Sequence, residues 1–391
     1  MEVRRLTEQE HFEADLISHV AFHMRMEDPE KAREESRKMT VEDWGAFADD
    51  GKMMARIVNH RYDSWLDGQL VVNGGIGGVS TLPEYRNSGA IRKIFETLLP
   101  EARQRGEVIS TLYPFSHAFY RKFGYETACW KNEYEFAPGV LGEYRFEGTA
   151  ELWKPGDPVT EYTELYNQFA GGFNLAMRRD DRMMLDRHLK GEYYKDRKFS
   201  YLLREKGTPV AYLIFQDIRH DPAAILSVED LAWDGRDGLN ALLGFLGRFS
   251  ADYGTVRLWL PSWLQLYSLI RSPRAYDISQ RVNQNYMVRA VNVQRMLEVI
   301  RKPEGCRFVI RVEGDGQIPE NNGIWEVDGD RAAATDRTPD LTVSIQAFGQ
   351  MAAGCVSLYE AKHRPDVQVA GNEDTLAGVF VRKPILVGEH F

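Results

Sequence analysis

The stretch that decides the fold runs from Gly74 to Tyr125 and reads GGIGGVSTLPEYRNSGAIRKIFETLLPEARQRGEVISTLYPFSHAFYRKFGY. Apolar and β-branched residues over 76–81 predict a strand, and the turn that follows it passes through a proline. Apolar residues at helical spacing then predict a helix over 90–104. A second strand over 108–113 and a short helix that contains Tyr120 complete the stretch. Helices and strands that alternate in this way indicate an α/β domain.

The loop before the predicted helix has the features of a pyrophosphate site. Arg86 and Gly89 form an Arg-x-x-Gly pattern there, and the first turn of the helix leaves backbone N–H groups unpaired. The strand before the loop can present its backbone to an extended, amide-bearing chain, as the edge of a sheet does. A pyrophosphate loop beside such a strand is a way to bind coenzyme A. The residues expected to contact acetyl-CoA are Val79, Ser80, Arg86, Asn87, Ser88, Gly89, Ala90 and Ile91.

Two runs in this stretch resemble motifs of the GNAT acyltransferase family. The first, V-x-x-x-P-x-x-R-x-x-G, extends from Val79 to Gly89 and resembles the acetyl-CoA motif between the family's fourth strand and third helix. Ile91 departs mildly from that motif, which has a smaller residue there. The second run, F-Y-x-K-F-G-Y-E, extends from Phe119 to Glu126 and resembles a later motif whose tyrosine faces the thiol sulfur. The resemblance implies direct transfer of an acetyl group from acetyl-CoA to an amine, without a metal.

Tyr120 is the candidate general acid of that reaction. Acetyl transfer from a thioester to an amine needs a base for the amine, stabilisation of the oxyanion and an acid for the departing thiolate. A phenol with a pKa of about 10 is close enough to a thiol with a pKa of about 8.5 to supply that proton. Tyr120 also lies between Phe119 and Phe123, so the alternative is a residue that only packs the short helix.

Composition places the chain among globular proteins and argues against several classes. The 391 residues suffice for two or three domains, and 43% hydrophobic and 12% aromatic residues are typical of a folded chain. The net charge of -9 argues against a nucleic-acid partner, which requires a basic face. Cys129, Cys306 and Cys355 are isolated and predict neither a disulfide framework nor a metal site. Because the N-terminal residues lack a signal-peptide core and no apolar run reaches about 18 residues, we expect a cytoplasmic protein without a membrane segment.

The sequence predicts three domains. Residues 1–140 form the predicted catalytic GNAT domain with the acetyl-CoA site. Residues 141–287 repeat its order of strands, helix and strand, but Asp234 and Asp237 at the corresponding turn would repel a pyrophosphate. We therefore expect a second GNAT-like domain that has lost coenzyme binding. Residues 288–391 alternate strands, turns and helices, and after a tandem GNAT pair this α+β pattern resembles the sterol-carrier-protein-like domain.

Three domains in this order, over essentially the whole chain, resemble the Eis (enhanced intracellular survival) family. In that family the end of the chain returns to the first domain's active site, so the resemblance implies that the α-carboxylate of Phe391 acts as the base. The sequence predicts a helix over the first twenty residues and another after Pro29, and the resemblance implies that Glu27 and Asp28, between them, line the substrate cavity. The alternative is that these two residues belong to a solvated charge run. Acceptor amines of aminoglycoside, polyamine or lysine type and a homo-oligomer, a hexamer, follow from the same resemblance.

The residues alone leave alternatives open. An α-carboxylate is a poor base in water and terminal residues usually fray, in which case His117 or Glu27 becomes the candidate base. Tandem GNAT-like folds also occur in aminoacyl-tRNA-dependent peptidyl transferases, although those need a basic surface for tRNA. The alternative from a different class is a non-catalytic carrier in which the C-terminal domain binds a lipid.

Overall fold

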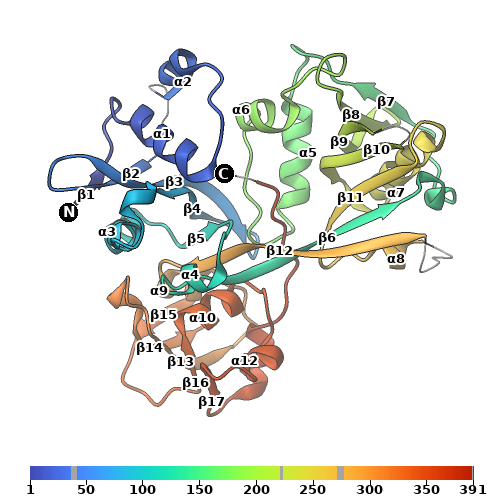
Figure 1. The fold of residues 1–391 in the computed structure, drawn as a ribbon. Coiled ribbons are helices and arrows are strands. Elements are labelled where there is room, and N and C mark those ends of the chain that lie inside the picture. Colours follow the sequence, from blue (N-terminus) through green and yellow to red (C-terminus); the bar gives the residue numbers. More distant parts are fainter. Residues whose placement is uncertain (37–41, 221–222, 271–276, 390) are drawn as a thin grey trace. The chain divides into compact units, whose positions relative to one another are not determined.

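The computed structural model describes residues 1–36, 42–220, 223–270, 277–389 and 391, which form two compact units. Unit 1 consists of Met1–Ala128, Tyr286–Lys383 and Glu389–Phe391. Unit 2 consists of Cys129–Asn285 and Pro384–Gly388. Figure 1 shows the helices and strands of both units.

The N-terminal residues of unit 1 build a mixed sheet. Its strands lie in the order β1-β2-β3-β4-β5, and the end of β12 pairs with β5. These strands are β1 (Glu2–Arg5), β2 (Glu42–Phe47), β3 (Met53–Leu66), β4 (Gln69–Thr81), β5 (Ile109–Leu112) and β12 (Ile278–Ala290). The helices of this part are α1 (His11–Phe22), α2 (Pro29–Ser36), α3 (Ala90–Gln104) and α4 (His117–Arg121). Only β4 and β5 run parallel among these described strand pairs.

The hairpin between β3 and β4 turns at Asp67 and Gly68. Their φ angles are 51° and 83°, as in a type I′ turn, which favours glycine at its second position. From the sequence, the Asp-Gly dipeptide predicts this turn, and the apolar residues around it predict separate strands over 54–59, 64–72 and 76–81. In the structure the ladder continues through His60 and Gly75, which pair directly, so the hairpin consists of two long strands.

The parallel pairing of β4 with β5 ends where the predicted site begins. The last paired residues are Ile76 and Leu112. A β-bulge follows in β4, where Gly78 and Val79 lie opposite the single residue Ile57 of β3. Gly78 has a φ of 57°, a conformation that favours glycine. The bulge and the end of the parallel ladder together leave backbone groups of β4 available to a ligand.

Helix α3 forms the core of unit 1 with the sheet. Its buried residues repeat at helical spacing and include Ile94, Phe95, Leu98 and Ala102. They belong to one hydrophobic cluster with buried side chains of β2 to β5, and this cluster also contains Tyr120. The bounds of α3 agree with the predicted range 90–104, because a long amphipathic pattern is the least ambiguous sequence signal.

The C-terminal part of unit 1 is a five-stranded sheet with short helices. Its strands lie in the order β15-β14-β13-β16-β17, and β13 runs parallel to β16. The strands are β13 (Arg307–Glu313), β14 (Gly323–Asp328), β15 (Arg331–Ala334), β16 (Leu341–Ser344) and β17 (Val367–Val369). The helices are α9 (Val293–Val299), α10 (Ile345–Ala352), α11 (Leu358–Ala361) and α12 (Glu373–Val379). The sequence does not predict the edge strands β15 and β17, because such short strands give too weak a pattern.

Unit 2 repeats the arrangement of the first sheet. Its strands lie in the order β6-β11-β10-β9-β8-β7, and the parallel pair is β10 with β11. The strands are β6 (Glu126–Phe136), β7 (Thr149–Leu152), β8 (Lys198–Glu205), β9 (Thr208–His220), β10 (Ala223–Trp233) and β11 (Thr255–Pro261). The helices are α5 (Thr160–Ala170), α6 (Asp181–Met183), α7 (Gly235–Gly247) and α8 (Leu266–Leu269).

The strand before α7 in unit 2 also resembles β4 in detail. A bulge between Val228 and Asp230 of β10 follows the parallel pairs with β11. At the start of α7, however, Asp234 is the N-cap and Asp237 lies in the first turn. Carboxylates at this place would repel a phosphate, and the loss of a coenzyme site in this unit stays a prediction.

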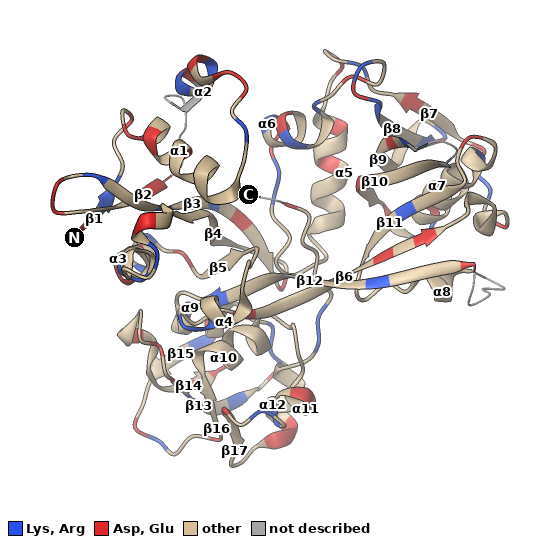
Figure 2. Cartoon of the chain, viewed as in Figure 1, with Lys and Arg blue, Asp and Glu red and all other residues tan. Residues whose placement is uncertain are grey.

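The division into domains 1–140, 141–287 and 288–391 stays a prediction, because unit 1 combines the first and the last parts of the chain. Among the described residues, no helix combines the length and apolar character that crossing a membrane requires. Acidic and basic residues are interspersed over the described parts of both units (Figure 2).

Candidate active site

The loop between β4 and α3 follows an irregular path that few residue types permit. It begins with a 3₁₀ turn over Pro83–Tyr85, after which Arg86 is extended. Asn87 and Gly89 have positive φ angles of 65° and 84°. Gly89 is the N-cap of α3, and because it has no side chain, the backbone N–H groups of the first turn stay accessible.

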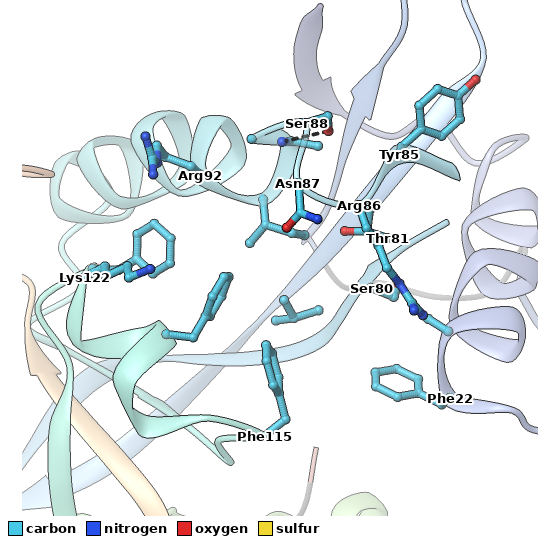
Figure 3. A pocket seen from close by; sticks show the side chains of 17 residues that line it. Phe22, Ser80, Thr81, Tyr85, Arg86, Asn87, Ser88, Arg92, Phe115 and Lys122 are labelled. Carbon is cyan, nitrogen blue, oxygen red and sulfur yellow. Dashed lines mark hydrogen bonds between the residues drawn. The ribbon is translucent and has the colours of Figure 1, made fainter. Parts of the chain in front are cut away.

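A cavity of about 710 Å³ opens beside this loop (Figure 3). Its size is within the usual range for sites of small molecules and cofactors. Residues of β4, of the loop, of the first turn of α3 and of α4 line it, together with Phe22 at the end of α1. All residues predicted to contact acetyl-CoA are among the lining: Val79, Ser80, Arg86, Asn87, Ser88, Gly89, Ala90 and Ile91. The structure thus brings them together, and their contact with acetyl-CoA stays a prediction.

The lining of this cavity is positively charged. Arg86, Arg92 and Lys122 belong to it, and the described lining residues include no Asp or Glu. This excess contrasts with the net charge of -9 for the whole chain. Figure 3 shows the Arg86 side chain extending toward Phe22. Cations and the first turn of a helix together favour a ligand with negative charges, such as a pyrophosphate.

Phenylalanine rings supply the apolar part of the lining. Phe115, Phe119 and Phe123 come from α4 and its flanking residues, and Phe22 comes from α1. The ring centroids of Phe119 lie 5.1 Å from Phe115 and 5.3 Å from Phe123. Rings beside cations fit a ligand that has both phosphate groups and apolar parts.

Tyr120 lies on α4, as predicted, with its ring in the aromatic core. The side chain is 2% exposed, and its ring centroid lies 5.2 Å from those of Phe115 and Phe119. It is not among the described residues that line the cavity. Burial, with a smaller effect of Tyr125, raises the pKa of the Tyr120 phenol above its usual value. The hydroxyl therefore stays protonated at neutral pH and can donate a hydrogen bond, but it is a weaker acid than an ordinary phenol.

The last residue, Phe391, lies against β3 and β4. Its ring centroid lies 5.8 Å from His60, 5.5 Å from Tyr62 and 5.8 Å from Tyr113. The hydroxyl of Tyr113 also donates a hydrogen bond of 2.7 Å to the backbone oxygen of Glu389. These contacts hold the end of the chain within unit 1, although His390 lies outside the described residues.

Two glycines of β4 make room for this terminus. A methyl group on Gly75 would lie 3.0 Å from the ring of Phe391, and one on Gly77 would lie 3.1 Å from its carboxyl carbon. Both glycines share one face of the strand, because side chains two residues apart point the same way. The glycine run over 74–78 does not fit a dinucleotide fingerprint. Gly75 and Gly77 serve instead to admit the chain terminus.

His60 is a candidate site residue that the sequence does not single out. Its Nε2 and the oxygen of Phe391 each lie 3.3 Å from the point that a methyl group on Gly77 would occupy. The imidazole and the carboxylate therefore both lie beside Gly77, just beyond the parallel ladder of β4 and β5. The sequence feature that could have pointed to His60 is a histidine and a tyrosine, His60 and Tyr62, opposite a glycine-rich strand. It can be interpreted only once the register between β3 and β4 is known.

Replacement of Gly77 by valine is expected to displace the carboxylate of Phe391 and to lower turnover about tenfold or more. The fold should tolerate the change, because valine is favourable in a strand. Turnover, acetyl-CoA affinity and the melting temperature are the measurements. The control is Gly139→Ala, where a methyl group meets nothing within 4 Å. Unchanged turnover in Gly77→Val would show that the terminus takes no part in the reaction.

A buried polar network connects α1 with the bulge of β4. Arg56 donates hydrogen bonds of 3.1 and 2.5 Å to the two carboxylate oxygens of Asp43 and one of 3.3 Å to Ser18. The hydroxyl of Ser18 lies 3.2 Å from that of Ser80, which donates to the carbonyl of Gly78 at 3.0 Å. The side chain of Ser80 thus holds the bulge in place, so it is the backbone of β4 that we expect a ligand to contact.

Glu27 and Asp28 lie between α1 and α2, as predicted, but they are exposed and not among the described residues of the cavity lining. The carboxylate of Asp28 accepts hydrogen bonds from the backbone N–H groups of Glu30 and Lys31, at 3.1 and 3.0 Å. Asp28 therefore caps α2. A role of Glu27 and Asp28 in substrate binding stays a prediction.

The three cysteines are free and buried. In the part of the chain that the structure describes, no three or more His, Cys, Asp or Glu residues are grouped so that they could hold a metal ion.

Comparison with protein families matches the N-terminal part and the C-terminal part of unit 1 to one known domain each. Residues 2–128 match the acetyltransferase (GNAT) domain. The chain contains a GNAT acetyltransferase domain. Residues 293–386, downstream of the GNAT domain, match the sterol carrier protein domain. These matches confirm the predicted fold class, and the first assigns residues 2–128 to the acetyltransferase (GNAT) domain.

Solved structures share the fold of the GNAT domain and of the rest of the chain. A conserved protein of unknown function from Enterococcus faecalis V583 has a TM-score of 0.85 and 22% identity, over 98% of this chain and 97% of that one. A GCN5-related N-acetyltransferase from Anabaena variabilis ATCC 29413 has a TM-score of 0.84 and 21% identity, over 98% of both chains. Eis1 from Mycobacterium abscessus has a TM-score of 0.82 and 19% identity, over 100% of both chains. The fold is therefore Eis-like. No protein of curated function matches the sequence.

Proposed function

We propose that this protein transfers the acetyl group of acetyl-CoA to an amine, with the cavity beside α3 as the coenzyme site. The observation that supports this best is the lining of that cavity. It combines the predicted loop Arg86–Ile91, three cations and no described acidic residue. In a chain with a net charge of -9, such a lining favours an anionic ligand.

The residues present fit acetyl-CoA. The first turn of α3 and the side chains of Arg86 and Lys122 would hold its phosphate groups. The bulge at Gly78 and Val79 would present backbone groups to the amides of the pantetheine arm. Acetyl-CoA, when bound, supplies the acetyl group as a thioester.

Phe391 is the proposed base. Its carboxylate lies beside Gly77, where the parallel ladder of β4 and β5 has ended. The rings of His60, Tyr62 and Tyr113 pack against the ring of Phe391 and so hold the terminus beside Gly77. The carboxylate accepts the proton that the amine loses. His60, whose Nε2 also lies beside Gly77, is the residue that we propose to orient the carboxylate.

Tyr120 is the proposed donor to the departing sulfur. Because burial raises the pKa of its phenol, the hydroxyl is protonated at neutral pH. A donated hydrogen bond stabilises negative charge that develops on the sulfur, whether or not the proton is fully transferred. The acceptor that we propose is an amine of the aminoglycoside, polyamine or lysine type, since each arrives as a cation at a carboxylate.

The test is release of free thiol from acetyl-CoA in the presence of amines of these three types. Acetylated amine detected by mass spectrometry, in amounts equal to the thiol, supports the proposal. Acetyl-CoA hydrolysis without an acetylated amine, or no turnover with any amine, contradicts it. A lipid carrier would release no thiol, and a peptidyl transferase would require aminoacyl-tRNA.

Tyr120→Phe is expected to lower turnover by about 10²-fold while the affinity for acetyl-CoA changes little, because the hydroxyl acts on the transition state. The matched control is Tyr125→Phe, which removes another buried hydroxyl, one bonded to Ser110 at 2.8 Å. That control should lower the melting temperature without a comparable loss of turnover. If turnover of Tyr120→Phe falls by less than about threefold, Tyr120 only packs the core and is not the donor to the sulfur.

We also propose that the protein acts in the cytoplasm as a homo-oligomer, a hexamer, as its resemblance to the Eis family implies. Light scattering at micromolar concentration should give a mass near six times 44.9 kDa. A mass of one chain would contradict the hexamer.

A further inference from the structure

Three side chains hold the turn after α4: Gln346 and Gln350 from α10 in the C-terminal part of unit 1, and Arg289 from the end of β12. The amide of Gln346 donates a 3.0 Å hydrogen bond to the carbonyl of Arg121, and the amide of Gln350 donates a 2.7 Å bond to that of Thr127. Between them, the guanidinium of Arg289 donates to the carbonyl of Phe123. We call Arg289, Gln346 and Gln350 the carbonyl clamp. Gln346 and Gln350 lie four residues apart on α10, so they reach the turn from one face of that helix.

The turn that the clamp holds is built on Tyr120. The backbone N–H groups of Phe123 and Tyr125 both donate to the carbonyl of Tyr120, at 2.9 and 3.4 Å. Helix α4 has only five residues and ends at Arg121. Carbonyls at the end of a helix lack intrahelical partners, and a helix this short has little stability of its own. Donors from elsewhere are therefore needed to fix the direction in which Tyr120 points.

The clamp residues are themselves held rigidly. Arg289, which is fully buried, donates to both carboxylate oxygens of Asp315 at 2.8 and 2.7 Å. Asp315 in turn accepts a 2.9 Å hydrogen bond from the Asn321 side chain. Arg364 donates to the side-chain oxygen of Gln350 at 3.0 Å, which directs the NH₂ group of Gln350 toward Thr127.

Gly124 shows that the turn and the clamp fit each other closely. Its φ is 85°, in the left-handed region that favours glycine. A side chain on Gly124 would also collide with the guanidinium of Arg289. The glycine of the F-G-Y-E run is thus required both by the turn and by the approach of Arg289.

We propose that the sterol-carrier-like part of the chain positions Tyr120 for catalysis through the carbonyl clamp. It does so directly by Gln346 and Gln350 of α10. It does so indirectly by Asp315, which holds Arg289 of β12. The clamp residues are positioning residues, since they contact the turn and not the reacting atoms. This inference rests on the proposed function of Tyr120. It assigns to the C-terminal domain a structural role in acetyl transfer that needs no bound lipid.

The test compares Gln350→Met and the double variant Gln346→Ala/Gln350→Met with the full-length wild-type protein. Methionine keeps the volume of glutamine but cannot donate a hydrogen bond. The matched control is Gln294→Met, because Gln294 also donates to a backbone carbonyl, that of Ala332 at 2.9 Å, which does not belong to the turn after α4. Hydrogen exchange of the amides at 123–127 is expected to be about tenfold faster in the clamp variants and unchanged in the control.

Kinetics then separate positioning from general loss of stability. We expect kcat to fall about tenfold in Gln346→Ala/Gln350→Met, whereas KM for acetyl-CoA stays within about twofold. In a Tyr120→Phe background the same substitutions should have little further effect on kcat, because they act through Tyr120.

Unchanged exchange at 123–127 would overturn the inference, and so would an equal loss of kcat with and without the Tyr120 hydroxyl. If the wild-type protein acetylates no amine, the proposed function fails. The exchange measurement then still decides whether the clamp holds the turn.

Discussion

Deletion of Phe391 is expected to lower turnover by about 10²-fold or more, because it removes the proposed base from its place beside Gly77. The new terminal carboxylate would lie one residue back along the chain, about 3.3 to 3.6 Å away if the tail stays extended. The deletion would also remove the contacts of the Phe391 ring with the rings of Tyr62 and Tyr113, which help to hold the end of the chain in place. Stability should change little, since a single terminal residue contributes few core contacts. The measurement is kcat with a saturating amine, at matched melting temperatures.

Two further variants separate the carboxylate from the ring. A C-terminal extension by one or more residues keeps the ring of Phe391 but converts its carboxylate to an amide, and it should be as damaging as the deletion. Phe391→Leu keeps the carboxylate and loses the aromatic contacts, so it should retain most of the activity. Equal turnover of the extended and native proteins would exclude the terminus as the base. His60 or His117 would then be the next candidates.

Gly89→Glu is expected to weaken acetyl-CoA binding by at least about 10²-fold. The φ of 84° at Gly89 imposes strain of about 1–2 kcal/mol on any residue with a side chain. A side chain there would enter open space beside the first turn of α3, where phosphate groups are proposed to bind. The added carboxylate would compete with and repel them. Calorimetry with acetyl-CoA measures the affinity directly.

Gly106→Glu is the matched control for this substitution. Gly106 has a φ of 89° and a side chain there would also meet nothing within 4 Å, but it lies just beyond the other end of α3. The strain and the added charge are therefore the same, and only the location differs. Gly106→Glu should bind acetyl-CoA with wild-type affinity. Equal affinities of the two variants would refute the assignment of the coenzyme site.

The sequence by itself predicted the elements whose signals are local. Helix α3 follows from its long amphipathic pattern, and the loop before it follows from Arg86 and Gly89. The hairpin follows from Asp67 and Gly68, whose turn type depends on the two residues alone. The eight predicted coenzyme contacts, which lie within thirteen positions of one another along the chain, also come together in the structure. Local geometry determined them, because a strand, a tight loop and a helix leave the backbone few other paths.

The tertiary structure alone decided which distant residues meet at the site. Phe391 reaches Gly75 and Gly77, and His60 faces the same place, only because β3 and β4 pair in one particular register. Burial of Tyr120 among aromatic rings changes its acidity, which no short motif reveals. The end of β12 joins β5 across a long separation in sequence. Contacts of this kind depend on how whole helices and strands pack together. The residues that neighbour them in the sequence therefore carry no pattern from which the contacts could be predicted.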